Sequence, residues 1–187
     1  MKEIKKMENK TYLVHGYLAS INSHWFPWLK QELSNKNEVL EIIKLPEPSH
    51  PKFDQWNIAV AEGLIHFHKN NTLIAHSLGC ISLLHYLSNY HGPAFSKLIL
   101  IGGFTESLPL FPELDDFIEK CNLNFEHIKS KANDIVVFYS TNDPIVNPVF
   151  TKKLAELLNA NLVAEENAGH FLDSDGYIEF KRIIDFL

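Results

Sequence analysis

The chain has 187 residues, of which 45% are hydrophobic and 21% are charged, so its composition is that of a globular protein and excludes a disordered or fibrous chain. This length corresponds to one domain of roughly 150 residues with some additional loop, and we treat residues 1–187 as a single domain. Seventeen Lys and Arg residues against 23 Asp and Glu residues give a net charge of −6. A negative chain is poorly suited to bind phosphate backbones or anionic lipid, so we expect a small-molecule ligand and neither nucleic acid nor membrane as a partner.

The cellular compartment is indicated by the N-terminal segment and the cysteines. Residues 1–10 contain four lysines and two glutamates and lack the apolar stretch of a signal peptide. The chain has no run of about 18 apolar residues that could cross a membrane. The two cysteines, Cys80 and Cys121, are too few for a disulfide framework, so we expect reduced thiols. These features predict a cytoplasmic protein.

Short apolar runs rich in β-branched residues predict the strands. Six such runs occur, at residues 12–14, 39–43, 72–75, 97–101, 135–139 and 161–164. Segments with helical spacing of apolar residues lie between them, at residues 25–33, 53–68, 78–90, 112–121, 148–158 and 177–186. Strands that alternate with helices and are apolar on both faces predict an α/β fold, in which helices cover both faces of a parallel sheet. In such folds ligands bind at the carboxyl ends of the strands, so the residues directly after each strand are the candidates for a site.

The third predicted strand runs into the sequence Ala75-His76-Ser77-Leu78-Gly79, which directly precedes a predicted helix. This sequence is a variant of the G-x-S-x-G nucleophile elbow, in which a sharp strand-to-helix turn exposes a serine hydroxyl. The turn needs small residues two before and two after the serine, and Ala75 and Gly79 meet that requirement. Ser77 has a second interpretation as an ordinary helix N-cap. Its place between a predicted strand and a predicted helix favours the nucleophile.

A serine hydroxyl near neutral pH needs a base to accept its proton and a carboxylate to orient that base. Asp143 lies in the turn after the fifth predicted strand, where an Asn-Asp-Pro turn is the alternative interpretation. Of ten histidines, only His170 follows both Ser77 and Asp143, which is the hydrolase order of serine, acid and histidine. Asp173 and Asp175 are weaker candidates for the acid, because they precede the last predicted helix as N-terminal caps do.

Stabilisation of a developing oxyanion requires two N–H donors aimed at one point. The amide of Leu78 follows the predicted nucleophile at the start of a helix and supplies one donor. The first predicted strand ends in His15-Gly16-Tyr17, where Gly16 lets the backbone approach a substrate. We predict that the amide of Tyr17 is the second donor.

Six motifs in one order carry a family resemblance: H-G-Y at 15–17, W-F-P-W-L at 25–29, L-P-E-P at 45–48, A-H-S-L-G at 75–79, S-T-N-D-P-I-V at 140–146 and G-H-F at 169–171. With these motifs the sequence resembles the small α/β-hydrolase-fold serine hydrolases grouped with retinoblastoma-binding protein 9 and the bacterial YdeN-like proteins. The resemblance implies a catalytic triad of Ser77, Asp143 and His170, position by position. It also implies a six-stranded parallel sheet in the order 2-1-3-4-5-6 with no large cap domain.

The sequence departs from the family pattern at three places. Ala75 stands at the first glycine of the elbow, and Asn147 stands where a proline is expected. Neither change removes a reacting group. The L-x-C-x-E motif associated with binding of the retinoblastoma protein has Ser82 in place of its glutamate, in the sequence Leu78-Gly79-Cys80-Ile81-Ser82, so we do not expect that partner.

The predicted reaction is transfer of an acyl group from a small ester, thioester or amide to Ser77 and then to water, which is carboxylesterase-like chemistry that needs neither a metal nor an organic cofactor. Peptidase activity stays open, because it uses the same groups. We expect the substrate pocket to include His15, Trp25, Phe104 and Phe171, with the segment 102–133 as a short cover. Two alternatives also stay open: a hydrolase-fold module that binds a protein with little catalysis, and an acyltransferase. The oligomeric state does not follow from the sequence.

Overall fold

The computed structural model describes residues 10–187, so the prediction about the N-terminal segment falls largely outside the described residues. Its strands are β1 (Lys10–Val14), β2 (Val39–Ile43), β3 (Thr72–His76), β4 (Phe95–Ile101), β5 (Ala132–Ser140) and β6 (Asn161–Glu165). Its α-helices are α1 (Phe26–Asn35), α2 (Phe53–Gly63), α3 (Leu78–Ser88), α4 (Asp115–Lys120), α5 (Phe125–Lys131) and α6 (Pro148–Leu158). Three 3₁₀ segments complete the described part: η1 (Pro112–Leu114), η2 (Asp173–Asp175) and η3 (Lys181–Phe186).

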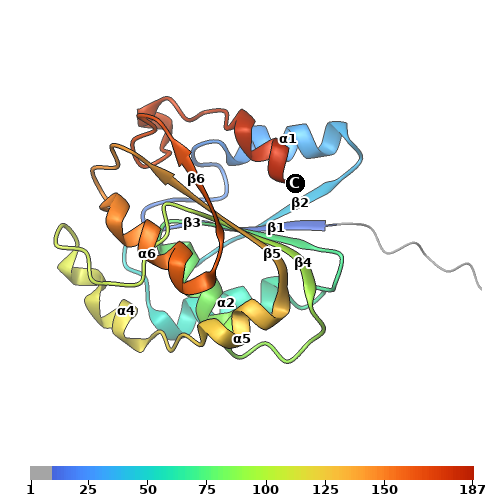
Figure 1. The fold of residues 1–187 in the computed structure, drawn as a ribbon, viewed down its shortest axis with the longest axis horizontal. Coiled ribbons are helices and arrows are strands. Elements are labelled where there is room, and N and C mark those ends of the chain that lie inside the picture. The colour runs from blue at the N-terminus through green and yellow to red at the C-terminus, as the bar shows by residue number, and fades with distance from the viewer. Residues whose placement is uncertain (1–9) are drawn as a thin grey trace, which may run out of the picture.

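The strands form one parallel sheet in the order β2-β1-β3-β4-β5-β6, which confirms the predicted order (Figure 1). The chain passes from β1 to β2 on one side and returns to β3 on the other side of β1. Val14, at the end of β1, is therefore in register with both Ile43 and Ala75. This arrangement brings the loop after β1 beside the loop after β3, at the point where the direction of winding reverses.

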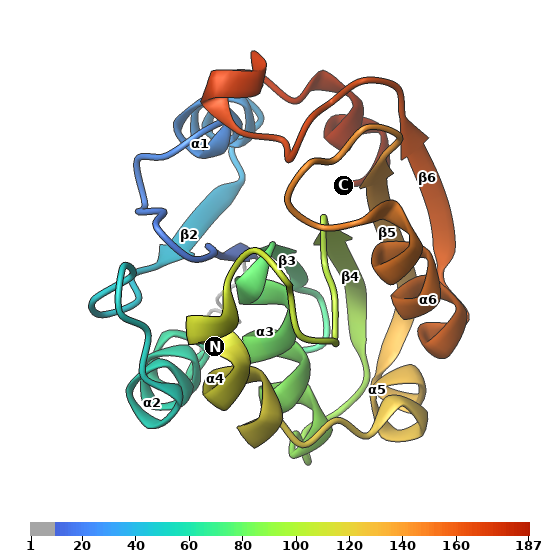
Figure 2. The same ribbon diagram turned by 90° about the vertical axis from the view of Figure 1, so that its left-hand side faces the viewer.

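Helices cover both faces of the sheet, as the alternation of elements predicts. One face carries α1 and the C-terminal η3 segment, while α2, α3, α5 and α6 lie on the other face (Figures 1 and 2). Each layer has its own buried cluster. Phe26 and Leu29 of α1 pack with Phe180 on the first face, whereas Trp56 of α2 and Leu154 of α6 belong to the second cluster. The two clusters fix the sheet from both sides and hold the loops at its carboxyl edge.

Three predicted helices differ from the structure. The helix predicted at 53–68 ends at Gly63, and the apolar Ile65 that extended the pattern is 75% exposed. The segment 112–121 begins as 3₁₀ helix before α4, and residues 177–186 contain only the 3₁₀ segment η3. In the last case Phe180 and Ile183 are buried while Ile178 is exposed. Helical spacing of apolar residues thus marked buried residues such as Phe180 and Ile183, but it also included the exposed Ile65 and did not give the type of helix.

Helix α5 is absent from the sequence-based prediction. Asn124 caps it, since the Asn124 side chain accepts a hydrogen bond from the His127 amide at 3.0 Å. The helix is seven residues long and buries only Ile128, so its apolar pattern is too short to recognise. Together η1, α4 and α5 occupy the segment 102–133, where the chain has no large cap.

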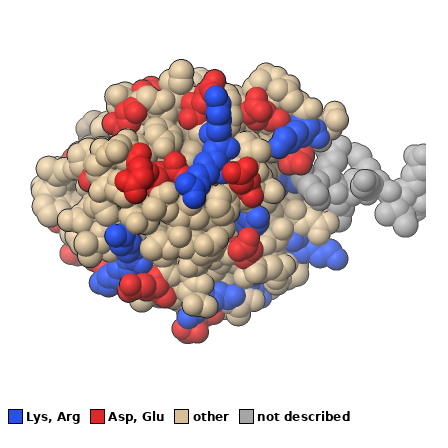
Figure 3. Space-filling view, turned by 45° about the horizontal axis from the view of Figure 1, so that its top comes forward, with Lys and Arg blue, Asp and Glu red and all other residues tan. Residues whose placement is uncertain are grey.

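Three further features relate to the expectations from the sequence: the surface charge, the cysteine thiols and the lengths of the helices. On the face shown in Figure 3, acidic and basic side chains are interspersed and neither sign gathers into one large patch. Cys80 and Cys121 are free thiols. Between residues 10 and 187, no helix has the length and apolar character needed to cross a membrane.

Candidate active site

The turn between β3 and α3 places Ser77 in an unusual backbone conformation, with φ 55° and ψ −128°. A positive φ is uncommon for a residue with a side chain and costs free energy that the surrounding structure must supply. The Ser77 amide donates to the Ile101 carbonyl at 2.9 Å, which ties the turn to β4. Ser77 occupies the N-cap position of α3, but its side chain makes no capping hydrogen bond to the helix. The turn instead leaves the hydroxyl free to point away from the helix.

Gly79 lets α3 approach β1 closely. A Cβ atom at this position would lie 2.4 Å from the carbonyl oxygen of His15 and 2.6 Å from that of Val14. Backbone atoms cannot move aside as a flexible side chain can, so this position requires glycine. Ala75, on the strand side of the turn, is fully buried, and the elbow forms with alanine there.

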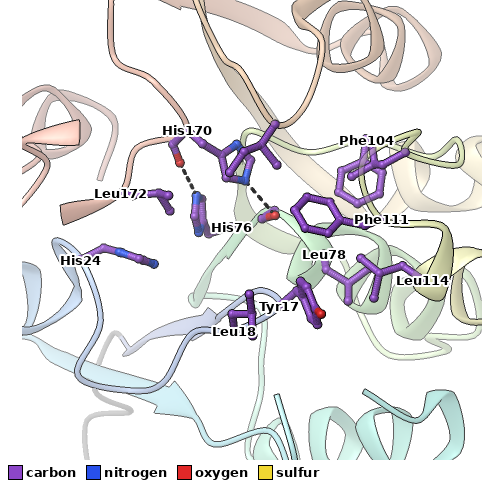
Figure 4. Close-up of a pocket in the computed structure, with 13 residues that line it drawn as sticks. Tyr17, Leu18, His24, His76, Leu78, Phe104, Phe111, Leu114, His170 and Leu172 are labelled. Carbon is purple, nitrogen blue, oxygen red and sulfur yellow. Dashed lines mark hydrogen bonds between the residues drawn. The ribbon is translucent and has the colours of Figure 1, made fainter. Parts of the chain in front are cut away.

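Asp143, His170 and Ser77 form one hydrogen-bonded line. His170 Nδ1 lies 2.7 Å from Asp143 Oδ2, and His170 Nε2 lies 2.9 Å from Ser77 Oγ, the second contact being drawn in Figure 4. The His170 and Asp143 side chains are only 3% and 2% exposed. The three residues come from the ends of β3, β5 and β6, so the parallel sheet is what brings them together.

The orientation of Asp143 is fixed by its own turn. Its Oδ1 accepts hydrogen bonds from the amides of Ile145 and Val146, both at 2.9 Å. The turn interpretation of Asp143 is therefore also correct, and it involves only one of the two carboxylate oxygens. The other oxygen, Oδ2, remains for His170. A negative carboxylate at Nδ1 favours the tautomer with a proton on Nδ1, which leaves Nε2 free to accept the serine proton.

The loop that carries His170 is fixed on both sides of the residue. Its amide donates to Asp175 Oδ2 at 2.8 Å, and its carbonyl accepts a hydrogen bond from His76 Nε2 at 2.9 Å (Figure 4). Asp175 accepts from the Leu172 amide at the start of η2, so it caps a 3₁₀ segment, whereas the α-helix predicted after Asp173 and Asp175 does not form.

The loop after β1 lies against the elbow. A Cβ atom on Gly16 would lie 2.9 Å from Ser77 Cβ and 3.4 Å from the Leu78 amide nitrogen. Within residues 10–187, neither the Tyr17 amide nor the Leu78 amide has a hydrogen-bond acceptor. Two free N–H groups therefore occur in the two loops that meet at the serine, where the sequence predicts oxyanion donors.

A cavity of about 130 Å³ adjoins Ser77 and His170 (Figure 4). Its wall is mainly apolar, and its polar members include the histidines His24, His76 and His170. Besides Ser77 and His170, the lining consists of Tyr17, Leu18, His24, His76, Leu78, Phe104, Leu108, Phe111, Leu114, Ile145 and Leu172. The segment 102–133 supplies four of these, including the predicted Phe104. The Tyr17 hydroxyl donates to Glu113 Oε1 at 3.1 Å, which links the β1 loop to this cover.

Three residues predicted to line the pocket lie elsewhere. His15 is buried beneath the loop, where its Nε2 accepts from the Leu45 amide at 3.2 Å. Trp25 and Phe171 are fully buried in the cluster on the α1 face of the sheet, where both pack against Phe180. Aromatic residues near the site thus contribute to the core, and the sequence could not separate the two roles.

Two histidines of the cavity wall, His24 and His76, were not predicted as site residues. Burial lowers the pKa of His76 well below its usual value, and the nearby His170 and His24 act in the same direction. Burial also lowers the pKa of His24. His76 directly precedes the serine, so its position in the sequence could have indicated a place in the site. Nothing in the sequence marks His24 as a site residue.

No group of three or more His, Cys, Asp or Glu side chains suited to a metal ion occurs in the described part of the chain. The polar groups at the serine are instead an imidazole, a carboxylate and two amides.

The comparisons with known proteins agree with this architecture. The six-stranded sheet, the elbow and the absence of a large cap define an α/β-hydrolase fold. A family model described as "Serine hydrolase" matches residues 11–187, and the chain belongs to this family.

Among its relatives, "Putative hydrolase YdeN" from Bacillus subtilis is 34% identical over 184 residues, which cover 97% of this chain and 95% of the relative. The crystal structure of the B. subtilis ydeN gene product has a TM-score of 0.91 over 95% of this chain and 96% of the other. "Serine hydrolase RBBP9" from Rattus norvegicus is 25% identical over 161 residues, covering 86% of this chain and 84% of the relative. These similarities confirm the family resemblance inferred from the six motifs.

Proposed function

We propose that this protein is a carboxylesterase-like serine hydrolase that cleaves a small ester, thioester or amide through an acyl-enzyme on Ser77. The observation that carries this proposal is the continuous hydrogen-bonded line from Asp143 through His170 to Ser77. A surface serine that serves only as a cap needs neither a buried imidazole within bonding distance nor a carboxylate behind that imidazole. Membership of the serine hydrolase family supports the same assignment.

In the first half of the proposed reaction, Ser77 Oγ forms a bond to the substrate carbonyl carbon while its proton passes to His170 Nε2. The carbonyl oxygen becomes negative and accepts hydrogen bonds from the amides of Tyr17 and Leu78. The bond from carbon to the leaving oxygen, sulfur or nitrogen then breaks. The proton on His170 passes to that leaving atom, so an alcohol, thiol or amine departs and the acyl group stays on Ser77.

Water completes the second half. It gives a proton to His170 Nε2 while its oxygen attacks the acyl carbon, and the bond to Ser77 Oγ breaks as His170 returns that proton to the serine. Asp143 keeps its negative charge throughout, because its Oδ1 accepts two amide hydrogen bonds and its Oδ2 faces the imidazolium. The products are a carboxylic acid and regenerated enzyme.

The wall of the cavity supports a compact apolar acyl group. Phe104, Leu108 and Leu114 are buried residues of this wall, and the partly buried Phe111 adds to the same apolar surface. A cavity of about 130 Å³ suits a small acyl group better than a long chain. We therefore expect short aliphatic or aryl acyl esters to be cleaved faster than esters with long chains.

A fluorophosphonate probe together with p-nitrophenyl esters of graded acyl length tests this function. The folded protein should form a mass adduct at Ser77 and hydrolyse short esters, whereas Ser77→Ala should lose the adduct and nearly all turnover. Thioesters and aminoacyl amides of the same acyl groups would rank the three leaving atoms. Absence of an adduct in folded protein would instead favour the binding module, and product formation on an added alcohol at the expense of hydrolysis would favour the acyltransferase. Full turnover by Ser77→Ala would show that the nucleophile is wrongly assigned.

A further inference from the structure

The cavity has two chemically different sides. In Figure 4, Phe104, Phe111 and Leu114 lie on one side of the serine, and His24, His76 and Leu172 lie on the other. We call these the apolar side and the histidine side. The proposed reaction uses His170 and two backbone amides, so it assigns no role to His24, although that ring forms part of the wall.

The tautomer of His24 follows from its neighbours. The Asp173 amide donates to His24 Nδ1 at 3.2 Å, which requires a lone pair on Nδ1 and therefore places the proton of a neutral ring on Nε2. Asp173 Oδ1 also lies 3.3 Å from Nδ1, and it already accepts from the Ser174 amide at 2.9 Å. A protonated ring would donate from Nδ1 to this carboxylate and would still carry a proton on Nε2. A neutral ring with its proton on Nδ1 would leave the Asp173 amide without its acceptor, so we assign the proton to Nε2, which is then a donor.

This Nε2–H group is unpaired. No acceptor for it lies within hydrogen-bond distance among residues 10–187, yet the His24 side chain is only 13% exposed. Nε2 is not among the fully covered atoms that lack a partner, so it retains some open surface. The His24 ring points toward His76 at the edge of the cavity (Figure 4). A donor that is mostly withdrawn from solvent, on a ring that lines a substrate cavity, favours a ligand with an acceptor atom.

The backbone holds this donor in place. His24 has a φ of 55°, a left-handed conformation that few side chains adopt readily, and its ring makes edge contacts with Phe26 and His76 at 5.5 and 5.6 Å between centroids. The ring is therefore fixed by Asp173 on one side and by aromatic contacts on the other. Such fixation reduces the entropy lost when a ligand hydrogen bond forms.

The histidine side adjoins the group that handles the leaving atom. His76 lies 5.0 Å from His170 and 5.6 Å from His24, measured between ring centroids, so the three rings follow one another away from the serine. His170 Nε2 gives its proton to the leaving atom, and we assign the leaving group to the histidine side because the apolar side suits the acyl group. The acyl group then occupies the apolar side.

We propose that His24 is a specificity-determining residue whose Nε2–H donates a hydrogen bond to an acceptor oxygen on the leaving group. This inference rests on the proposed function. The preferred substrates then join a compact apolar acyl group to an alcohol or amine that carries a carbonyl oxygen beyond the scissile bond. Because His24 lies past His76 from the serine, the acceptor must be several bonds from the leaving atom.

Matched butyrate esters test the proposal. The 2-oxopropyl and 4-oxopentyl esters carry a ketone oxygen, and the 2-methylpropyl and 4-methylpentyl esters replace that oxygen by a methyl group of similar size. The measured quantity is the ratio of kcat/KM for each oxo ester to that for its methyl partner. Comparing this ratio between variants and wild type removes the difference in intrinsic reactivity between the esters.

Two variants remove the donor differently. His24→Phe keeps an aromatic ring without an N–H group, and His24→Asn tolerates a positive φ while its shorter side chain withdraws from the cavity. The exposed His66 gives a matched control, His66→Phe. We expect both His24 variants to lower the oxo-to-methyl ratio about threefold to tenfold, the range of one neutral hydrogen bond, for at least the longer pair. The control should leave the ratio unchanged.

Decay of the isolated butyryl-enzyme separates this role from a structural one. The leaving group has departed by then, so His24→Phe and His24→Asn should deacylate at the wild-type rate. Two outcomes would overturn the role of His24 and leave the proposed function intact. Active His24 variants could keep the wild-type oxo-to-methyl ratio, or their deacylation could slow enough to account for the whole loss of activity. If no butyryl-enzyme forms on Ser77 in wild type, the proposed function fails and this inference fails with it.

Discussion

His76 and His170 are joined by a hydrogen bond in which His76 Nε2 donates to the His170 carbonyl oxygen at 2.9 Å. The two residues are 94 positions apart in the sequence, and one directly precedes the serine while the other faces it. His76 is fully covered, and its Nδ1 has no partner in the described part of the chain. This bond therefore connects the turn that carries Ser77 to the loop that carries His170, and it helps to set the distance between these two residues.

Replacement of His76 by phenylalanine should lower kcat more than it changes KM. The ring volume stays, but the His170 carbonyl loses its donor, and a small displacement of the imidazole is costly in rate. We expect kcat to fall about tenfold and the free energy of unfolding to fall by about 1–3 kcal/mol, the usual cost of an unpaired buried group. Steady-state kinetics and urea unfolding measure the two effects. An increase in KM at unchanged kcat would argue against a positioning role for His76.

Asp143→Asn should nearly abolish turnover while the fold is retained. The two amide donors at Oδ1 will hold the amide oxygen, so the amide nitrogen will face His170 Nδ1. An N–H group there needs a lone pair on Nδ1, which moves the ring proton to Nε2 and blocks acceptance of the serine proton. By analogy with the same change in serine proteases, we expect a loss of about 10⁴-fold in kcat. Circular dichroism checks the fold, and activity within tenfold of wild type would contradict the proposed role.

Gly79→Ala tests whether the elbow requires glycine on its helix side. The added Cβ would meet the carbonyl oxygens of His15 and Val14 at less than 3 Å, and both belong to the backbone of the neighbouring segment. We expect destabilisation of about 1–3 kcal/mol, the range for overpacking, together with slower fluorophosphonate labelling of Ser77 because α3 must shift. Gly176→Ala, where a Cβ meets nothing within 4 Å but φ is +89°, shows for comparison what backbone strain alone costs without a clash. Wild-type stability and labelling in Gly79→Ala would mean that the close approach is not required.

The sequence predicted the parts of this site that depend on topology. The alternating elements predicted a parallel sheet and the family resemblance predicted its strand order, and such a sheet brings the loops after β3, β5 and β6 to one edge. For this reason Ser77, Asp143 and His170 could be proposed from their positions after strands and their chain order. The predicted residues do meet within bonding distance.

The pocket could not be predicted in the same way. Trp25 and Phe104 are both buried aromatic residues near the site, but only Phe104 lines the cavity, since α1 turns Trp25 into the opposite core cluster. Which side of a loop an aromatic ring occupies depends on packing between distant segments. His24 illustrates the same limit, because its role depends on contact with Asp173, 149 positions away.

Phe104→Ala should shift the preferred acyl group toward longer chains. Phe104 is 1% exposed and forms part of the cavity wall, so truncation extends the space beside the serine. We expect the optimum in an ester series to move by two or more carbons, at a cost of about 3–5 kcal/mol in unfolding free energy. The series is measured as kcat/KM against acyl length, below the unfolding temperature of the variant. An unchanged optimum would place the acyl group elsewhere in the cavity.

The stability of the protein should depend on pH through its buried histidines. The pKa of His76 is lowered well below 6.5 in the folded state, mainly by burial and further by the neighbouring His170, His24 and His15. Between the folded and unfolded pKa values, the unfolded chain binds a proton at this residue that the folded protein does not. The contribution of His76 to the free energy of unfolding is thus fully present above pH 6.5. As the pH falls below 6.5, this contribution decreases by up to about 1.4 kcal/mol per pH unit. His15 and His24, whose pKa values are also lowered by burial, act in the same direction.

Urea unfolding from pH 7.5 to 5.0 measures this loss of stability. In His76→Phe, the slope of unfolding free energy against pH below pH 6.5 should be shallower than in wild type by that amount. Because carboxylates and the other histidines titrate in both proteins, the difference between the two curves isolates His76, and parallel curves would show that its ring is not kept neutral by the fold.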